Sequence, residues 1–302
     1  MQPVRTFSDL VSRLSSQGRR LRVAVINAAD ESTVTALCKA IDKGFARGIL
    51  VGTQPNEALK ACLSPYSEHI TYLPAADEDE AARMAVELVR NEEADILMKG
   101  LLHTDNLLRA VLDKQHGLLP PGRVLSHITV AELPDFPRLL FITDVAVIPQ
   151  PTDEQREWQV RYIDALCRNF GISAPRIGLV HFTEKVSPKF PLTLHYRALA
   201  EASAQGAWGA TIIDGPLDVR TCLDPEALRA KGIRSPLRGY ADALVFPDLE
   251  SGNSFYKTIT FFAHATVAGI LQGTTAPVVL TSRGDDARSK FLSLATAAIS
   301  LN

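Results

Sequence analysis

The chain has 302 residues, of which 46% are hydrophobic and 22% are charged, and its formal net charge is −2. That length suits one large domain or two of medium size, with room for a substantial core. The nearly balanced charge, with no basic block, argues against nucleic acid or a membrane surface as a partner.

The first part of the chain alternates short β-branched runs with stretches of helical periodicity. Strands are predicted at 21–28, 49–52, 69–73 and 94–100, and helices at 30–48, 77–94 and 104–115. These strands are nearly continuous apolar runs rather than alternating ones, which is typical of a parallel sheet covered on both faces.

The middle of the chain departs from this alternation. Two predicted strands, 124–133 and 138–148, are joined by a short Pro-rich link with no helix, which favours an antiparallel hairpin. The alternation then resumes, with helices at 153–170, 191–206, near 224–231, 251–271 and 290–301, and strands at 176–182, 211–217, 242–249 and 277–282. The pattern predicts an α/β protein with largely parallel sheets and helices on both faces.

Two segments rich in Pro or Gly are candidate domain crossovers, 118–123 and 273–277. We therefore expect residues 1–122 plus 273–302 to form a first α/β domain. Residues 123–272 are expected to form a second α/β domain inserted into it. The final strand and helix would then return to the sheet of the first domain.

The N-terminal residues contain no apolar stretch like that of a secretory signal peptide, and no apolar run reaches the ~18 residues of a membrane span. Four cysteines are scattered along the chain without a CxxC pair: Cys38, Cys62, Cys167 and Cys222. We therefore expect reduced thiols and a cytoplasmic protein.

Polar residues follow several predicted strands, at the sheet edge where ligands of open α/β proteins bind. They are Lys99, Gly100, His103, Thr104 and Asp105 after one strand, Asp214 after another, Asp248, Gly252 and Asn253 after a third, and Thr281, Ser282 and Arg283 after the last. Ser126 and His127 interrupt the first strand of the expected hairpin. These residues are the candidate site.

Three of these segments, 99–105, 250–254 and 281–286, resemble turns that open a helix. Free N–H groups and the helix dipole favour an anion at such a position, and Lys99 and Arg283 add full positive charges. Each turn alone is better explained by helix capping. Three of them together, two with a cation, favour a phosphate site.

Individual residues leave alternatives open. Arg283 could bind phosphate or an oxyanion, or could pair with Asp285 or Asp286. Ser282 lacks a GxSxG context, so a nucleophile elbow is not indicated, and Arg109 taken alone resembles a solvated side chain. Asp214 and Asp218 are four residues apart, but the Gly-Pro between them favours a turn and a cap over a metal site.

The sequence gives little support for a metal site or a nucleotide-binding motif. Seven histidines are spread out without an HExxH motif or a close His/Cys cluster, so no metal site is predicted. The sequence also lacks a GxGxxG segment after the first strand and a P-loop pattern, which would mark a nucleotide site.

Five stretches carry a resemblance to a known family: residues 94–112, 125–132, 138–147, 214–217 and 231–283. They resemble the phosphate acetyltransferase/phosphate butyryltransferase family, and the likeness extends from about Leu21 to Ala298. The segments "PDLESGNSFYK" and "APVVLTSR" are the most similar, whereas "MKG" and "SHITVAE" are closer to the butyryltransferase branch.

The resemblance implies a reversible reaction in which an acyl-CoA and phosphate give an acyl phosphate and free CoA. It also implies a two-domain fold related to isocitrate and isopropylmalate dehydrogenases, with the active site in the cleft between domains. The expected protein is a homodimer or larger, formed through the inserted domain. It would bind no cofactor, because CoA and phosphate are substrates.

The same resemblance assigns roles to residues. Ser282 and Arg283 match the family's active-site pair, Arg109 matches a phosphate-binding arginine, and Gly252, Asn253, Tyr256 and Lys257 match a segment beside the substrates. Lys99, Gly100, His103, Thr104, Ser126 and His127 are further predicted substrate-binding residues. A base proposed in the acetyltransferase branch falls on Ser289 here, so Asp285 or Asp286 would have to replace it.

Two other functions remain as alternatives. One is a metal-dependent decarboxylating dehydrogenase of the related fold, which would use Asp214 and Asp218. The other is a non-catalytic module that binds CoA or an acyl phosphate. The predicted transferase mechanism needs no covalent nucleophile, because direct attack within a ternary complex requires only positioning and oxyanion stabilisation.

Overall fold

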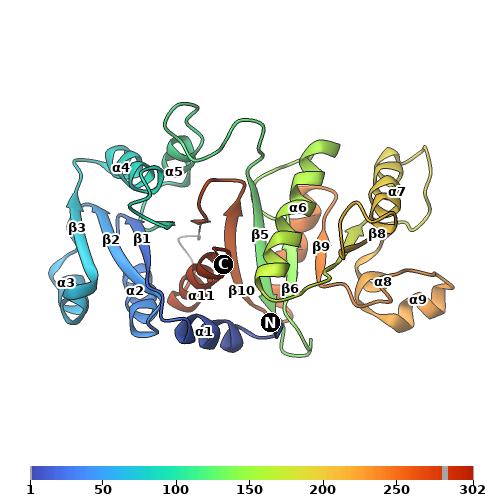
Figure 1. Ribbon diagram of the computed structural model, residues 1–302, viewed down its shortest axis with the longest axis horizontal. Helices are drawn as coiled ribbons and strands as arrows, with labels where there is room; N and C mark the ends of the chain where they lie inside the picture. The colour runs from blue at the N-terminus through green and yellow to red at the C-terminus, as the bar shows by residue number, and fades with distance from the viewer. Residues whose placement is uncertain (1, 281–284, 302) are drawn as a thin grey trace. The chain divides into compact units, whose positions relative to one another are not determined.

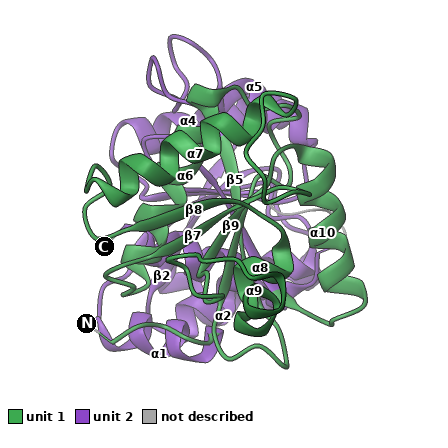
Figure 2. Ribbon diagram, turned by 90° about the vertical axis from the view of Figure 1, so that its right-hand side faces the viewer, with its two compact units in different colours: residues 1–6, 126–266 green, residues 7–125, 267–302 purple. Residues whose placement is uncertain are grey.

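The computed structural model describes residues 2–280 and 285–301. The chain forms two compact units, shown in separate colours in Figure 2. Unit 1 consists of residues 1–6 and 126–266, and unit 2 consists of residues 7–125 and 267–302. The first six residues thus belong to the unit formed by the middle of the chain, and not to the one that follows them directly.

The described part of unit 2 contains a mostly parallel sheet with the strand order β3-β2-β1-β4-β11-β10 (Figure 1). Its strands are β1 (Leu21–Ile26), β2 (Ala46–Gly52), β3 (Ile70–Pro74), β4 (Ile96–Lys99), β10 (Thr266–Gln272) and β11 (Val278–Val279). Only β10 runs antiparallel to its neighbour β11, with Leu271 opposite Val278. The chain returns to this sheet through β11, which pairs in parallel with β4.

Helices cover both faces of the unit 2 sheet, as Figures 1 and 2 show. Their bounds are α1 (Phe7–Ser16), α2 (Glu31–Asp42), α3 (Glu57–Leu63), the 3₁₀ helix η1 (Ser64–His69), α4 (Glu78–Arg90), α5 (Thr104–Val111) and α11 (Ala287–Ile299). Helix α2 packs against α11, and α4 packs against α5. In α4, Ala81, Ala85 and Val89 recur every fourth residue and are buried, which explains why this sequence forms an amphipathic helix there.

The described part of unit 1 contains strands in the order β5-β6-β9-β7-β8. They are β5 (Ser126–Glu132), β6 (Leu140–Thr143), β7 (Arg176–Val180), β8 (Ile212–Leu217) and β9 (Ala243–Val245). β5 and β6 pair in antiparallel fashion, with Val130 opposite Phe141, and the other pairs are parallel. The predicted hairpin is therefore confirmed. The helices are α6 (Asp153–Asn169), α7 (Pro191–Ala204), α8 (Val219–Leu223), α9 (Pro225–Lys231) and α10 (Leu249–Phe261).

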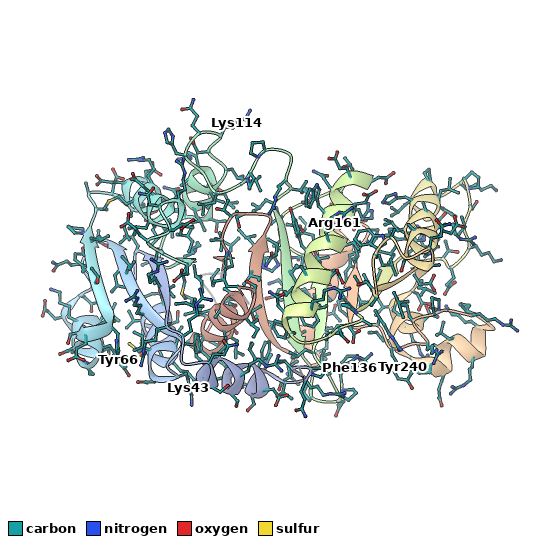
Figure 3. All side chains as sticks on the ribbon, viewed as in Figure 1. Lys43, Tyr66, Lys114, Phe136, Arg161 and Tyr240 are labelled. Carbon is teal, nitrogen blue, oxygen red and sulfur yellow. The ribbon has the colours of Figure 1, made fainter. Side chains whose placement is uncertain are left out.

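The turn between β5 and β6 is tied to the segment that enters β9. Arg138 donates a hydrogen bond from Nη2 to the carbonyl of Ala241 at 3.0 Å. Its guanidinium lies 4.6 Å from the ring centre of Phe136 and 5.8 Å from that of Tyr240, two residues that Figure 3 labels. These contacts fix both segments at the same edge of the unit 1 sheet.

Several predicted elements differ in the structure. The helix predicted at 251–271 is wrong in its second half: α10 ends at Phe261, His264 adopts a positive φ of 51°, and the chain continues as strand β10. The helix predicted at 30–48 ends at Asp42, and β2 begins at Ala46. The sequence did not predict helices α1, α3 and α8 or the 3₁₀ helix η1.

The strand predicted at 211–217 is confirmed, because β8 spans Ile212–Leu217. Asp214 therefore lies within β8 and not after the end of a strand, where the candidate site places it. Proline is tolerated there because β8 is the last strand in the order and needs no N–H donor on its outer side. The expected capping role of Asp218 is confirmed, because its carboxylate accepts from the Thr221 N–H at the start of α8.

Candidate active site

The carboxylate of Asp144, directly after β6, organises the polar residues of unit 1. Asp144 is only 2% exposed. Its oxygens accept hydrogen bonds from one hydroxyl and four backbone amides: Ser126 Oγ (2.9 Å) and the N–H groups of His127 (3.2 Å), Ala146 (2.8 Å), Val147 (2.9 Å) and Ile148 (3.3 Å). One carboxylate therefore holds the start of β5 and the 144–148 turn in a single arrangement.

Ser126 and His127 reach this position because β5 is antiparallel to β6. The beginning of β5 consequently lies beside the end of β6. Ser126 is fully buried, and its Oγ also lies 3.3 Å from Thr143 Oγ1. Thr143 in turn donates to the carbonyl of His127 at 2.9 Å. The two predicted substrate-binding residues thus belong to one hydrogen-bonded cluster.

The first turns of α10 lie against the same 144–148 turn. A Cβ added to Gly252 would lie 2.2 Å from the carbonyl oxygen of Asp144, so only glycine permits this approach. The Asn253 side chain donates to the carbonyl of Val145 at 2.9 Å. Gly252 and Asn253 therefore lie close to Ser126 and His127. These residues were predicted from the sequence to meet at one edge of the sheet.

The segment 250–254 lies in the first turns of α10, so it opens a helix as the sequence predicts. The N-terminus of this helix is already capped by Asp248, whose carboxylate accepts from the Ser251 N–H at 2.8 Å. The N–H of Gly252 donates to the Asp248 carbonyl at 3.2 Å. Tyr256 and Lys257 follow one turn later, with the Lys257 ammonium 4.8 Å from the ring centre of Tyr256. At the start of α10, the Asp248 carboxylate therefore already accepts a backbone N–H that could otherwise donate to an anion.

In unit 2, Lys99 and Gly100 form a tight turn against the end of β1. The N–H of Gly100 donates to the Ile26 carbonyl at 2.9 Å, and a Cβ at Gly100 would lie 2.3 Å from the Asn27 carbonyl oxygen. Asn27, with a φ of 49°, also accepts from the Thr53 N–H at 3.2 Å. Asn27 thus joins the carboxyl ends of β1, β2 and β4. Lys99 is 2% exposed at this edge.

Helix α5 begins just beyond this turn and carries no side-chain cap. Its N-cap residue, His103, makes no capping hydrogen bond from its side chain, in contrast to Asp77 at the start of α4. The backbone N–H of His103 donates to Glu78 Oε2 at 3.3 Å, and Thr104 is exposed. The first-turn N–H groups of α5 therefore have no side-chain cap, while Glu78 and Asp105 place carboxylates at the same helix start.

Arg109 extends toward α4. Its Nη1 lies 3.5 Å from Asp79 Oδ1, and the side chain is 70% exposed. Asn106 donates to the same carboxylate oxygen at 2.8 Å. These residues line a cavity of about 630 Å³ between α4 and α5. The contacts are those of a surface ion pair, so the phosphate-binding role of Arg109 rests on the family resemblance.

The predicted catalytic residues Ser282 and Arg283 lie outside the described residues. Of the two candidate bases, Asp286 caps α11 and accepts from the Ser289 N–H at 2.7 Å. That hydrogen bond lowers the pKa of the Asp286 carboxyl, which makes it a weaker proton acceptor. The neighbouring Asp285 is partly exposed.

A buried lysine anchors the beginning of α11. Lys290 is 3% exposed, and its Nζ lies 2.9 Å from Asp30 Oδ1 and 3.0 Å from Thr33 Oγ1. Burial raises the pKa of Asp30, but hydrogen bonds from Ser32, Thr33 and Lys290 together outweigh it and lower the pKa to about 2. Helix α11 is thus fixed to the start of α2, the helix that follows β1.

Lys290→Met is expected to lower the free energy of unfolding by about 3 kcal/mol, because it leaves Asp30 without its ammonium partner in a largely buried site. Since the pKa of Asp30 is depressed on folding, the wild type should lose this contribution as the pH falls from about 4 to about 2. Urea unfolding at pH 7 and pH 3 measures both effects. If the difference in the free energy of unfolding between wild type and variant is as large at pH 3 as at pH 7, this explanation is wrong.

The two carboxylates considered for a metal have other partners. Asp214 accepts from Ser235 Oγ at 2.5 Å, and Asp218 pairs with Lys231 at 2.5 Å. Among the residues that the structure describes, no three His, Cys, Asp or Glu side chains lie close enough to share a metal ion. Within the same residues, no helix combines the length and apolarity that crossing a bilayer requires.

Sequence reasoning missed three residues of these clusters: Asn27 and Lys290 in unit 2, and Asp144 in unit 1. Asp144 lies within a stretch that the sequence predicts as a continuous strand, and Lys290 at the start of a predicted helix. The available signal was a charged or amide side chain directly beside an apolar run. That signal did not distinguish them from ordinary turn and surface residues.

Comparison with known proteins identifies the family. Residues 73–298 match the family described as "Phosphate acetyl/butaryl transferase". A phosphate acetyltransferase of Thermotoga maritima is 34% identical and covers 97% of this chain and 99% of its own, and a phosphate butyryltransferase of Clostridium acetobutylicum is 36% identical and covers 98% of each.

Solved structures agree. A branched-chain phosphotransacylase from Enterococcus faecalis superposes with a TM-score of 0.82 at 29% identity, covering 93% of this chain and 99% of its own. The chain therefore belongs to the phosphate acetyltransferase/butyryltransferase family of acyltransferases.

Proposed function

We propose that this protein transfers a short acyl group, butyryl or acetyl, reversibly between CoA and inorganic phosphate. The observation that carries the proposal is the match to phosphate acetyl- and butyryltransferases over nearly the whole chain. The uncapped N-terminus of α5, beside Lys99 at the carboxyl edge of the unit 2 sheet, supports it as a place for an anion.

In the direction that forms acyl phosphate, a phosphate oxygen attacks the acyl carbonyl carbon of the thioester. A C–O bond forms, the carbonyl oxygen becomes an oxyanion, and collapse of this intermediate breaks the C–S bond and releases CoA thiolate, which takes up a proton. In this proposal Arg283 and Ser282 donate to the oxyanion. Lys99, Gly100, His103, Thr104 and Arg109 hold the phosphate.

We assign the exchange of the CoA thiol proton to the carboxylate of Asp285 rather than to that of Asp286. Asp286 caps α11, and its lowered pKa makes it the poorer base. Ser126, His127, Gly252, Asn253, Tyr256 and Lys257 are proposed to contact the acyl-CoA. For Ser126, His127, Gly252 and Asn253, the contacts with Asp144 and Val145 support this assignment, since a substrate contact must be held rigidly.

The protein is further proposed to act in the cytoplasm as a homodimer that associates through unit 1. The four cysteines Cys38, Cys62, Cys167 and Cys222 are free thiols, as expected in a reducing compartment. Phe182, Phe261 and Phe262 of unit 1 are 73%, 72% and 76% exposed, and association could bury such apolar side chains.

Release of thiol from acyl-CoA, measured with Ellman's reagent, tests the reaction. We expect release from acetyl-, propionyl- and butyryl-CoA that depends on added phosphate, with the chain-length preference read from kcat/KM. The same assay without phosphate controls for simple hydrolysis. Absence of phosphate-dependent release with every thioester would refute the transferase, and CoA binding without turnover would favour a non-catalytic module.

A further inference from the structure

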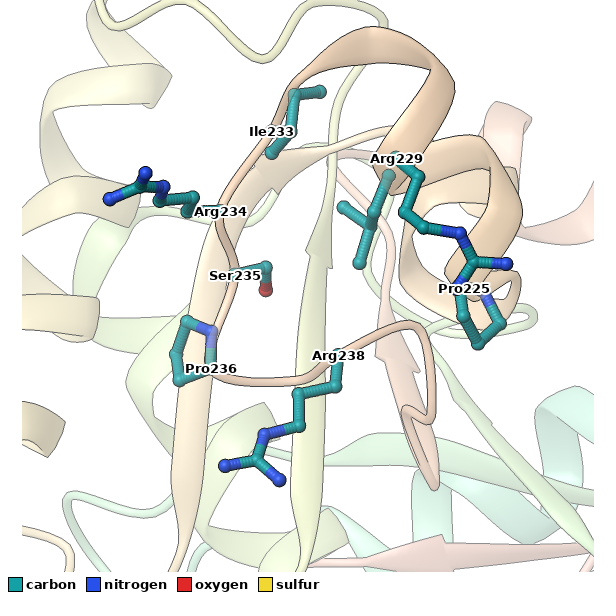
Figure 4. A pocket seen from close by; sticks show the side chains of 8 residues that line it. Pro225, Arg229, Ile233, Arg234, Ser235, Pro236 and Arg238 are labelled. Atoms are coloured by element: carbon teal, nitrogen blue, oxygen red, sulfur yellow. The ribbon is translucent and has the colours of Figure 1, made fainter.

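A pocket in unit 1 is rimmed by arginines and has no part in the site described above. Its volume is about 510 Å³, within the range of small-molecule sites. Its apolar part is formed by Pro225, Leu228, Ile233 and Pro236, and its polar part by Arg229, Arg234, Ser235 and Arg238. Figure 4 shows the three guanidinium groups on different sides of the pocket, around Ser235.

The charge of this pocket is largely uncompensated. Arg229 lies 3.3 Å from Glu226, but among the described residues neither Arg234 nor Arg238 forms an ion pair. Both of these side chains are exposed. Guanidinium groups bind phosphate oxygens through paired N–H donors, so a concave surface with two free arginines favours a phosphorylated ligand.

The loop that carries the pocket is held in place. The hydroxyl of Ser235 donates to Asp214 in β8 and accepts from the Leu237 N–H at 3.2 Å. A Cβ at Gly239, where φ is +75°, would lie 2.4 Å from the Pro225 nitrogen, so the loop packs tightly on the start of α9. A preformed pocket of this kind loses little conformational entropy when a ligand binds.

The pocket lies at the opposite end of the unit 1 strands from Asp144. Its loop leads into β9, and Arg176 at the first position of β7 donates to the Leu237 carbonyl at 3.4 Å. Asp248 and Gly252, by contrast, follow the carboxyl end of β9. Within unit 1 the two groups of residues are therefore at different sheet edges.

We propose that this pocket is a second ligand site, separate from the substrate site, that binds a nucleoside di- or triphosphate. The guanidinium groups surround the pocket instead of converging, so a single phosphate would contact only one or two of them. A chain of two or three phosphates can reach further around the rim. The leucine, isoleucine and proline side chains offer an apolar surface to the base.

Isothermal titration with ADP in the presence of saturating CoA tests the proposal, because CoA then occupies any nucleotide-binding part of the substrate site. We expect ADP to bind with one site per chain and adenosine to bind at least tenfold more weakly. Arg234→Gln/Arg238→Gln should weaken ADP binding at least tenfold. The control Lys189→Gln/Arg197→Gln removes the same charge from exposed positions of unit 1 and should leave ADP affinity within about twofold.

Three results would overturn the proposal: no binding of ADP, equal ADP affinity in wild type and the pocket variant, or ADP binding that is seen without CoA and lost when CoA is present. The last would place ADP in the substrate site. None of these outcomes depends on phosphate-dependent thiol release, so the proposed acyl transfer and this second site succeed or fail independently.

Discussion

Arg283→Ala is expected to lower phosphate-dependent thiol release from butyryl-CoA by about 10²–10³-fold, the usual cost of removing one oxyanion donor. A guanidinium can stabilise both the developing oxyanion and the incoming phosphate, and alanine can do neither. The loss should therefore fall mainly on kcat, with a smaller rise in the KM for phosphate. Steady-state kinetics with varied phosphate at saturating butyryl-CoA separates the two.

Arg288→Ala is the matched control for this change. Arg288 is an exposed residue in the first turn of α11, five positions further along the chain, and its removal alters the charge by the same amount. We expect its activity to stay within about twofold of wild type and both variants to show the wild-type urea midpoint. Wild-type turnover in Arg283→Ala would remove the proposed role of this residue.

The fold was largely predictable because burial on both faces leaves a plain sequence signature. The runs that form β1 and β4 contain almost no polar residue, so a parallel sheet covered by helices was the natural interpretation. The antiparallel β5–β6 pair was predicted because only a short Pro-rich link joins the two strands. In both cases a local pattern was sufficient.

The error at β10 has a different cause. Residues 262–272 are mostly apolar and follow a helix without a Pro or a Gly-rich break, so the 3.6-residue period could be continued through them. Pairing of Leu271 with Val278 decides in favour of the strand. That pairing depends on the tertiary fold, and such context overrides local propensity.

The candidate site was predictable only as a set of strand ends. Ser126, His127, Gly252 and Asn253 come from segments about 125 residues apart, and the sequence placed them at sheet edges without showing what joins them. The joining group, Asp144, depends on β5 and β6 being antiparallel and in register. Its partners are mostly backbone N–H groups, which leave no trace in the sequence.

Asp144→Ala is expected to be the most destabilising single change in unit 1. It would remove the acceptor for five hydrogen bonds, three of them from the buried or half-buried amides of residues 146–148. Each buried donor left without a partner costs about 1–3 kcal/mol, so we expect the free energy of unfolding to fall by about 3 kcal/mol or more. Urea unfolding followed by circular dichroism measures the change.

Asp144→Asn separates the loss of the carboxylate as a hydrogen-bond acceptor from the loss of side-chain volume that alanine also causes. It keeps one oxygen, which can still serve the Ala146 and Val147 amides, but its NH₂ group would face the Ser126 hydroxyl and the His127 N–H. Its stability should therefore lie between those of wild type and Asp144→Ala.

The control is Asp135→Ala, a change at an exposed position in the β5–β6 turn. If Asp144→Ala unfolds at the same urea concentration as this control, Asp144 does not organise the residues around it. If both Asp144 variants are destabilised in the expected order, the activity of Asp144→Asn is then measured at a temperature where it remains folded. A reduced kcat/KM for acyl-CoA there would show that this carboxylate also positions the residues proposed to contact acyl-CoA.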